Sequence, residues 1–306
     1  MTLKQTVDSF ILEQRLKGNT DKTILGYTSI LTRFTDWLAG KGVSLISELT
    51  LFQVQSYQLY IDSKPAERGG NEKLTKRSVQ TYMRHIKAFL TYCHSEEFIV
   101  IPLHKKIKLP KAERPTIEIL TDDEISTILS TFTKSETGLR NRALICLLLD
   151  CGLRLSEATG IETENINFEK GYMKVLGKGR KERIIPVGLK VRRLMLAYVN
   201  KRRAADAPED DKYFFLNKYR KPVSDGCIGT LMGRLKKRTG IARLHAHLFR
   251  HTFATNFLVN GLGDVYELSR ILGHSEMKVT EMYLQLASYY TIIEKRRKLS
   301  YLDMQK

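Results

Sequence analysis

One break in the apolar pattern divides the chain and constrains its fold more than any other feature. The segment LHKKIKLPKAERP, at residues 103–115, holds two prolines and five Lys or Arg residues and shows no apolar periodicity. Proline disfavours helix in the residue before it, and a basic run without periodicity does not pack into a core. We therefore predict an exposed linker at 104–115. The length of 306 residues fits one domain on each side of it.

Apolar residues before the linker recur at helical spacing. The strongest run, 19–38, has apolar residues at intervals of three and four, and weaker runs cover 3–16, 47–61 and 75–94. Residues 62–73 contain one proline and two glycines, which indicates a loop. The first domain, 1–103, is therefore predicted to be helical.

The pattern after the linker combines helices with a small sheet. Short apolar runs at 172–176 and 183–187 flank a glycine-marked turn, which predicts a β-hairpin, and 213–216 predicts a third strand. Helices are expected at 140–150, 191–203, 224–238 and throughout 245–306. The predicted fold class is mainly α with a small antiparallel β-sheet.

The charge balance indicates a polyanionic partner. Lys plus Arg is 51 and Asp plus Glu is 33, so the net charge is +18, and both halves are basic. Such an excess favours nucleic acid, although a basic protein without such a partner would show it too. No apolar run approaches the roughly 18–20 residues of a membrane span, and no secretory signal is visible. We therefore expect no membrane association. The four cysteines form no CxxC pair, which fits a reducing cytoplasm. With nucleic acid as the favoured partner, we expect the protein in a bacterial or archaeal cytoplasm, on the nucleoid.

Two predicted helices of the first domain have a basic face opposite their apolar stripe. Hydroxyl side chains lie between the basic residues of the second helix, at Ser78 and Thr81. Such a face suits phosphate contacts, although a solvated surface stripe has the same pattern. Together with the net charge, the pattern favours DNA contact through Lys22, Arg33, Lys76, Arg77, Arg84 and Lys87.

Four polar clusters lie beside apolar elements of the second half. Each has an ordinary structural explanation when taken singly: a helical ion pair, a turn, a helix cap and a core tyrosine. No Cys or carboxylate lies at zinc-like spacing beside the histidines, and Arg250 would repel a cation, so no metal is expected. The clusters are Arg154 with Glu157, Lys178 between two glycines, His247 with Arg250 and His251, and His274 followed nine residues later by Tyr283.

Taken together, these residue types suit phosphoryl transfer without a cofactor. Two Arg and a Lys can neutralise a phosphodiester and its transition state. A tyrosine can attack phosphorus and hold the phosphate covalently. A histidine can accept the phenolic proton or donate to a phosphate oxygen, and a Lys on a hairpin can protonate the leaving oxygen.

Four segments resemble the signature motifs of the tyrosine recombinase, or phage integrase, family. GLRLSEATGI, VLGKGRKERIIPV, HLFRHTFATNFL and LGHSEMKVTEMY occur in the family's order and at compatible spacing. By this resemblance Tyr283 is the nucleophile, Lys178 is the general acid, and His251 is structural. The resemblance makes Arg154 and Arg250 the clamping arginines, His247 and His274 the active-site histidines, Glu157 the support of Arg154, and Arg180 and Lys181 DNA contacts.

The resemblance also implies an architecture. Residues 1–103 would be a helical, SAM-like core-binding domain and 116–285 the catalytic domain, together closing as a C-shaped clamp around double-stranded DNA. The tail, 286–306, would dock on a neighbouring protomer through Ile293 and Leu299. The alternative for the tail is an amphipathic helix packed on its own catalytic domain.

The reaction implied is site-specific recombination through a 3′-phosphotyrosyl intermediate and a Holliday junction. It takes place in a tetramer on inverted-repeat core sites, with or without a second recombinase or accessory factor. The first predicted helix begins at residue 3, which leaves no room for the arm-binding domain of lambda-like integrases and favours a compact Xer-type or mobile-element enzyme. The loop at 62–73 is long for a minimal Xer-type enzyme and slightly favours the mobile-element role.

Two other functions stay open at this point. A type IB topoisomerase uses similar chemistry but relaxes supercoils as a monomer. A catalytically idle DNA-binding regulator would have no need of Tyr283.

Overall fold

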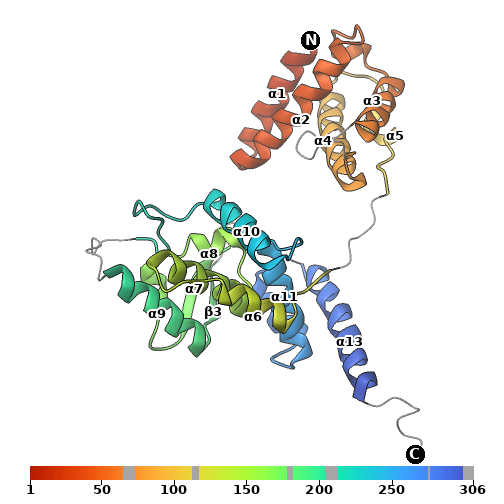
Figure 1. The fold of residues 1–306 in the computed structure, drawn as a ribbon. Helices are drawn as coiled ribbons and strands as arrows, with labels where there is room; N and C mark the ends of the chain where they lie inside the picture. Colours follow the sequence, from red (N-terminus) through yellow and green to blue (C-terminus); the bar gives the residue numbers. More distant parts are fainter. Residues whose placement is uncertain (65–72, 112–116, 178–181, 204–211, 275, 299–306) are drawn as a thin grey trace, which may run out of the picture. The chain divides into compact units, whose positions relative to one another are not determined.

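The chain separates into two compact units, Met1–Pro115 and Thr116–Lys306. The structure is a computed structural model of the protein (Figure 1). The structure describes residues 1–64, 73–111, 117–177, 182–203, 212–274 and 276–298.

The first unit is helical, as its apolar spacing predicts. Each of its four long helices begins after a threonine whose hydroxyl accepts a hydrogen bond from the backbone amide three residues on. Such caps satisfy amides that have no partner within the helix. The helices are α1 (Leu3–Leu16), α2 (Asp21–Ala39), α3 (Leu51–Ser63), α4 (Lys76–Ser95) and the short α5 (Leu103–Lys106).

Two boundaries in this unit differ from the sequence prediction. The predicted exposed linker, 104–115, starts too early, because α5 runs to Lys106 and Ile107 is buried in the apolar core of the unit. The helix predicted over 47–61 is split into a 3₁₀ turn at Ile46–Glu48 and α3, which begins at Leu51. Thr50 has extended backbone and caps α3, so the helix cannot start earlier.

Aromatic side chains fill the core between these helices. Phe10 of α1 is buried, and its ring packs at 5.1 Å from Tyr27 of α2 and at 5.6 Å from Phe89 of α4 (centroid distances). Both pairs are edge-on, which is a favourable aromatic geometry. Phe10 thereby ties the first, second and fourth helices into one core.

The second unit joins eight helices described by the structure to one antiparallel sheet. The strands β1 (Ile166–Asn167), β2 (Tyr172–Leu176) and β3 (Glu182–Pro186) lie in the order β1-β2-β3, with Met173 of β2 opposite Ile185 of β3. The helices are α6 (Asp122–Ser130), α7 (Glu136–Cys151), α8 (Leu155–Thr159), α9 (Leu189–Arg203), α10 (Asp225–Thr239), α11 (Ala246–Val259), α12 (Val265–Leu272) and α13 (Lys278–Lys298).

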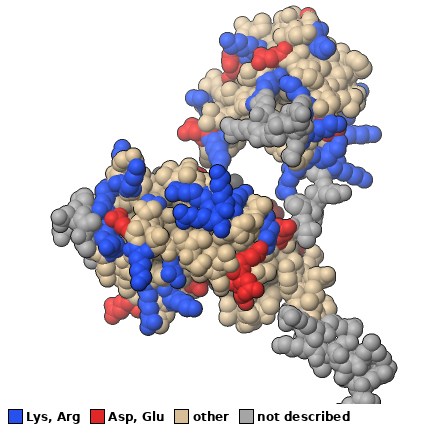
Figure 2. Space-filling view, viewed as in Figure 1, with Lys and Arg blue, Asp and Glu red and all other residues tan. Residues whose placement is uncertain are grey.

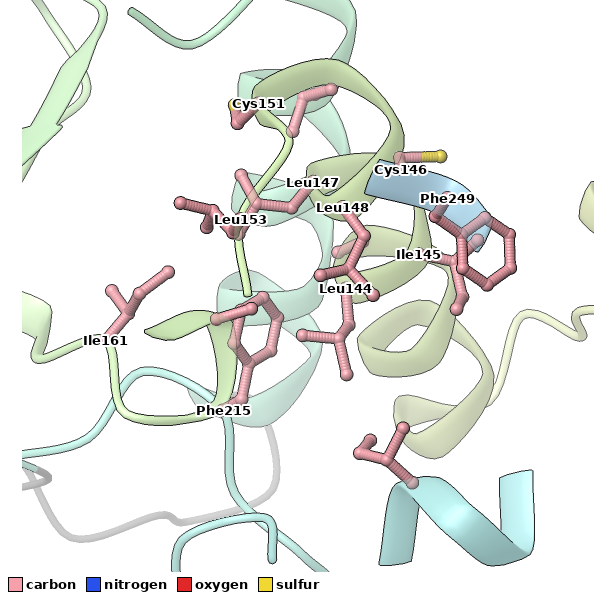
Figure 3. Close-up of a cluster of buried hydrophobic side chains, with 14 of the residues drawn as sticks. Leu144, Ile145, Cys146, Leu147, Leu148, Cys151, Leu153, Ile161, Phe215 and Phe249 are labelled. Carbon is pink, nitrogen blue, oxygen red and sulfur yellow. The ribbon is translucent and has the colours of Figure 1, made fainter. Parts of the chain in front are cut away.

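The helix α7 forms the centre of this unit. Its leucines Leu144, Leu147 and Leu148 are fully buried, and it packs against α9 and α11. Figure 3 shows its side chains in the middle of the apolar cluster, with Phe249 of α11 on one side and Phe215 on the other. A helix that is apolar on nearly every face has to lie inside a core.

The predicted fold class is confirmed, and one predicted strand is wrong. Residues 213–216 are not in the sheet; Tyr213 and Leu216 form only isolated bridges, to Glu162 and Pro222. The third strand is β1 instead, which is too short to show an alternating pattern in the sequence.

The predicted helical run from 245 onward is interrupted twice. It breaks between α11 and α12 and again after α12, where Gly261 and Gly273 have positive φ angles of 63° and 64°. Glycine adopts this left-handed backbone without the steric cost of a side chain, so it ends helices. In the part of the chain that the structure describes, every helix is too short or too polar to cross a bilayer.

Gly152 should be among the residues of the second unit that tolerate substitution least. It ends α7 with φ +58°, and a Cβ atom there would run into Phe253 and Leu272. We expect Gly152→Ala to lower the free energy of unfolding by about 2 kcal/mol or more. Gly233→Ala in α10 is the matched control: its Cβ would meet nothing within 4 Å, so stability should rise by up to about 1 kcal/mol. Denaturant unfolding of the full chain measures both, and equal stability of the two variants would contradict this account of Gly152.

Candidate active site

Arg250 is a buried cation whose hydrogen bonds, within the part of the chain that the structure describes, go to neutral groups. It lies on α11 and is 2% exposed. Its guanidinium donates to the carbonyl oxygen of Gly152 at 2.7 Å, to that of Leu272 at 2.8 Å and to Nε2 of His274 at 2.9 Å. Burial and the neighbouring Arg154 lower the pKa of Arg250 to about 10, so it stays charged at neutral pH. All three acceptors are neutral.

Two helix ends supply the two carbonyl acceptors. The backbone carbonyl of Gly152 lies at the end of α7, and that of Leu272 at the end of α12. Carbonyl groups at helix C-termini lack intrahelical partners and carry partial negative charge. The glycines that end these two helices thus create the acceptors that hold the guanidinium.

Arg154 lies at the same place but reaches the surface. It caps α8, and its side chain donates to Glu157 at 2.9 Å and more weakly to the carbonyl oxygens of Leu272 at 3.4 Å and Gly273 at 3.2 Å. The side chain is 33% exposed. Arg154 and Arg250 therefore share the carbonyl of Leu272, and Arg154 is the one of the two that solvent reaches more readily.

Glu157 is a carboxylate shared by two arginines. Besides Arg154, it accepts two hydrogen bonds from Arg183 of β3, at 3.0 and 2.8 Å. Burial by itself raises the pKa of the Glu157 carboxyl, but the hydrogen bonds from Arg183 and from the Arg154 backbone outweigh it, so the pKa lies below its usual value. The ionised Glu157 fixes Arg154 in place.

The hydrogen bonds of His274 define which ring nitrogen carries the proton. A guanidinium has only donors, so Nε2 of His274 must accept the bond from Arg250. The proton of the neutral ring is then on Nδ1, which donates to the hydroxyl of Thr280 at 2.8 Å. Burial and then Arg250 lower the pKa of His274 to about 4, so the ring is neutral at neutral pH.

Tyr283 is buried against two histidines. It lies on α13 and is 3% exposed. Its hydroxyl oxygen lies 2.8 Å from Nδ1 of His251, and its ring is nearly parallel to that of His274 at a centroid distance of 6.5 Å. Burial raises the pKa of Tyr283, against the opposing effect of Arg250 and Arg154.

His247 lies one helical turn before His251, and the two rings are 5.7 Å apart. Partial burial and the charge of Arg250 lower its pKa. The structure thus brings together all the predicted site residues of the second unit that it describes. Lys178, Arg180 and Lys181 lie outside the described residues.

The structure adds three residues that the sequence did not single out for the site. Arg183 lies in the predicted hairpin among several basic residues, and nothing in the pattern separates it from them. Thr280 is fully buried, and its hydroxyl is hydrogen-bonded to His274. His251, assigned a structural role from the sequence, contacts the hydroxyl of Tyr283 instead of only packing.

The basic residues predicted on the first unit differ in their surroundings. Arg77 and Arg84 of α4 are exposed, as is Lys22 of α2, while Lys87 is half-buried. The remaining two have partners within the unit: Lys76 pairs with Asp62 at 2.6 Å, and Arg33 donates to the hydroxyl of Tyr82 at 2.8 Å.

A further basic surface lies on the second unit. Figure 2 shows Lys and Arg side chains gathered over α10. The exposed basic residues of that helix are Arg234, Lys236, Lys237 and Arg238. This surface lay outside the set of DNA contacts predicted from sequence.

Comparison with known proteins agrees with this fold. Residues 118–289 match the phage integrase family. Since the match covers more than half of the chain, the chain belongs to that family.

Relatives and solved structures extend the likeness to nearly the whole chain. The tyrosine recombinase XerD of Bifidobacterium longum is 28% identical over 290 residues, 91% of each chain, and XerC of Bacillus pumilus is 27% identical over 298 residues, 94% of each. The Tn1549 transposon integrase in complex with transposon right end DNA is 21% identical, with a TM-score of 0.71 over 98% of this chain and 100% of that one. A lambda integrase dimer bound to a core site is 18% identical, with a TM-score of 0.70 over 92% and 95%.

The Arg183–Glu157 pair should contribute much more to the stability of the second unit than the surface ion pairs do. Its side chains are 12% and 5% exposed, so Arg183→Ala leaves a buried carboxylate with half of its side-chain partners. We expect the free energy of unfolding to fall by about 3 kcal/mol. Lys212→Ala, which breaks the ion pair of an exposed lysine with Glu162, should cost much less, because solvent screens that pair. Unfolding of the two variants measures the difference, and a loss below 1 kcal/mol for Arg183→Ala would mean that Arg154 alone holds Glu157.

Proposed function

We propose that the chain is a tyrosine-type site-specific DNA recombinase, an enzyme that cleaves and rejoins DNA strands. The observation that carries this proposal is the buried guanidinium of Arg250, hydrogen-bonded to neutral acceptors, in the same site as the buried hydroxyl of Tyr283. Membership of the phage integrase family and the similarity to tyrosine recombinases agree with it.

The charges of the site favour an anionic substrate. A buried cation is costly unless an opposite charge compensates it. Glu157 is the carboxylate whose charge acts on Arg250, and Arg154 and Arg183 already take its hydrogen bonds. The site therefore has an excess of positive charge that an anionic phosphodiester would neutralise, with Arg154 and Arg250 as its clamp.

The reacting groups are Tyr283 and Lys178. The Tyr283 oxygen attacks phosphorus, forms the 3′-phosphotyrosyl bond and releases the 5′-oxygen. Lys178 donates the proton that the 5′-oxygen takes up, and the 5′-hydroxyl of another strand reverses the step. His247 and His274 would lie beside the phosphate. Nε2 of His274 can donate to a phosphate oxygen only after it gains a proton and the bond from Arg250 is broken.

Basic residues of both units would bind the DNA on which the protein assembles. Arg77 and Arg84 of α4, Lys22 and Lys87, and the basic residues of α10 would contact the phosphate backbone of double-stranded DNA, with the two units closing on it as a clamp. Lys76 and Arg33 can take part once they exchange their present partners for phosphate. Four copies on inverted-repeat core sites would exchange strands through a Holliday junction.

The C-terminal helix supports an intermolecular role for the tail. In Figure 1 the second half of α13 runs beyond the rest of its unit. Ala287 is buried, whereas Tyr289, Ile292 and Ile293 are exposed. We propose that this apolar end docks on a neighbouring protomer; Leu299, expected to join it, lies outside the described residues.

Two rival functions predict different products. A type IB topoisomerase would relax supercoiled plasmids without a site-specific product, and an idle regulator would form no covalent adduct. Sequencing of genomic DNA that co-purifies with the protein supplies the target site for the tests that follow.

Tyr283→Phe should bind the target duplex with unchanged affinity and form no covalent adduct. The phenyl ring keeps the packing against His274, but the nucleophilic oxygen is absent. A nicked suicide duplex, on which the wild type accumulates adduct, measures the difference on a denaturing gel. Tyr219→Phe, at a tyrosine of the second unit that is 70% exposed, is the control and should react like wild type. An adduct in Tyr283→Phe would move the nucleophile to another residue.

A further inference from the structure

The hydroxyl of Tyr283 has a partner that the roles proposed above leave unused. Nδ1 of His251 lies 2.8 Å from the hydroxyl oxygen, and the ring centroids are 5.7 Å apart. The two residues come from different helices, α11 and α13, which pack against each other. The contact is therefore held by the core of the unit.

The other two histidines of the site are placed differently. Both nitrogens of His274 are engaged, Nε2 with Arg250 and Nδ1 with Thr280, and Nδ1 carries the proton. His274 therefore has no lone pair left for a phenolic proton. His247 lies against the ring of His251 at 5.7 Å, and the hydroxyl bond of Tyr283 goes to His251.

We propose that His251 is a catalytic residue that accepts the phenolic proton of Tyr283 during strand cleavage. The assignment rests on the proposed recombinase function. As the oxygen–phosphorus bond forms, the proton passes from the Tyr283 hydroxyl to Nδ1 of His251. The bond from phosphorus to the 5′-oxygen breaks, and that oxygen takes a proton from the general acid. In rejoining, the protonated His251 returns its proton to the departing tyrosyl oxygen.

The surroundings of His251 keep it ready to accept a proton. Burial lowers its pKa to about 4, with smaller contributions from the charges of His247, of His245 just before the helix, and of Arg250. Tyr283 faces it from α13. The ring is therefore neutral at neutral pH, and one of its two nitrogens carries a lone pair; the proposal requires that this nitrogen is Nδ1.

Binding of DNA would make this base stronger. A phosphodiester between Arg154 and Arg250 cancels part of the positive potential that disfavours an imidazolium. The charge that develops in the transition state does the same, so the proton acceptor gains strength during the step that needs it.

The test separates a base from a group that only orients the tyrosine. His251→Asn places an amide near the position of Nδ1, which keeps a hydrogen-bonding atom but has no basicity. We expect single-turnover cleavage of the suicide duplex to slow by about 10²–10⁴-fold in His251→Asn and in His251→Ala, with target binding unchanged. His94→Asn, in the first unit, is the matched control and should cleave like wild type.

The outcomes distinguish this assignment from the function on which it rests. If the wild type forms no tyrosyl adduct, the recombinase function fails and the assignment fails with it. If the wild type forms the adduct and His251→Asn cleaves within about threefold of it, the assignment alone is wrong and His251 only positions Tyr283.

A second measurement needs no variant. Nitrogen-15 NMR of the wild-type protein should find the His251 proton on Nε2, because Nδ1 must be free to accept from Tyr283. A proton on Nδ1 would overturn the proposal.

Discussion

The guanidinium of Arg250 is a permanent charge held inside the second unit by acceptors that have no charge. Its partners are the carbonyl groups at the ends of α7 and α12 and one ring nitrogen of His274. Those carbonyls are available because Gly152 and Gly273 turn the chain out of the helix at these points. The same bonds tie α7, α11 and α12 together, so the site and the packing of these helices depend on each other.

The remaining charges follow from this arrangement. One buried carboxylate, Glu157, serves Arg154 and Arg183, which leaves the site with more positive than negative charge. That excess, together with burial, keeps His251 and His274 neutral. Such a site suits a negatively charged phosphodiester. The same positive charge and burial keep the imidazoles beside the buried tyrosine neutral. The phage integrase family, to which the chain belongs, provides the chemical context for such a site.

Local patterns in the sequence were sufficient for most of the fold. The helix predicted over 3–16 and the strand predicted over 172–176 have the bounds of α1 and β2, because threonine caps and glycine turns mark their ends. The two-residue strand β1 could not be predicted, since its pairing with β2 depends on tertiary contact and leaves no periodicity. The site shows the same contrast between local sequence patterns and tertiary contacts. Its motifs were visible in sequence, whereas the bond from Arg183 to Glu157 joins positions 26 residues apart, and that from Tyr283 to His251 spans 32.

The central claim is that Arg250 acts on the negative charge of the scissile phosphate. The direct measurement compares cleavage by wild type and Arg250→Ala on two duplexes, one with the natural phosphodiester and one with an uncharged methylphosphonate at the cleaved position. Loss of a buried donor to developing charge costs about 10²–10³ in rate. The account predicts a loss of at least this size on the phosphodiester and a much smaller one on the methylphosphonate, which has no anionic oxygen for Arg250 to neutralise. Equal losses on the two duplexes would contradict it, because Arg250 would then serve the fold and not the charge of the phosphate.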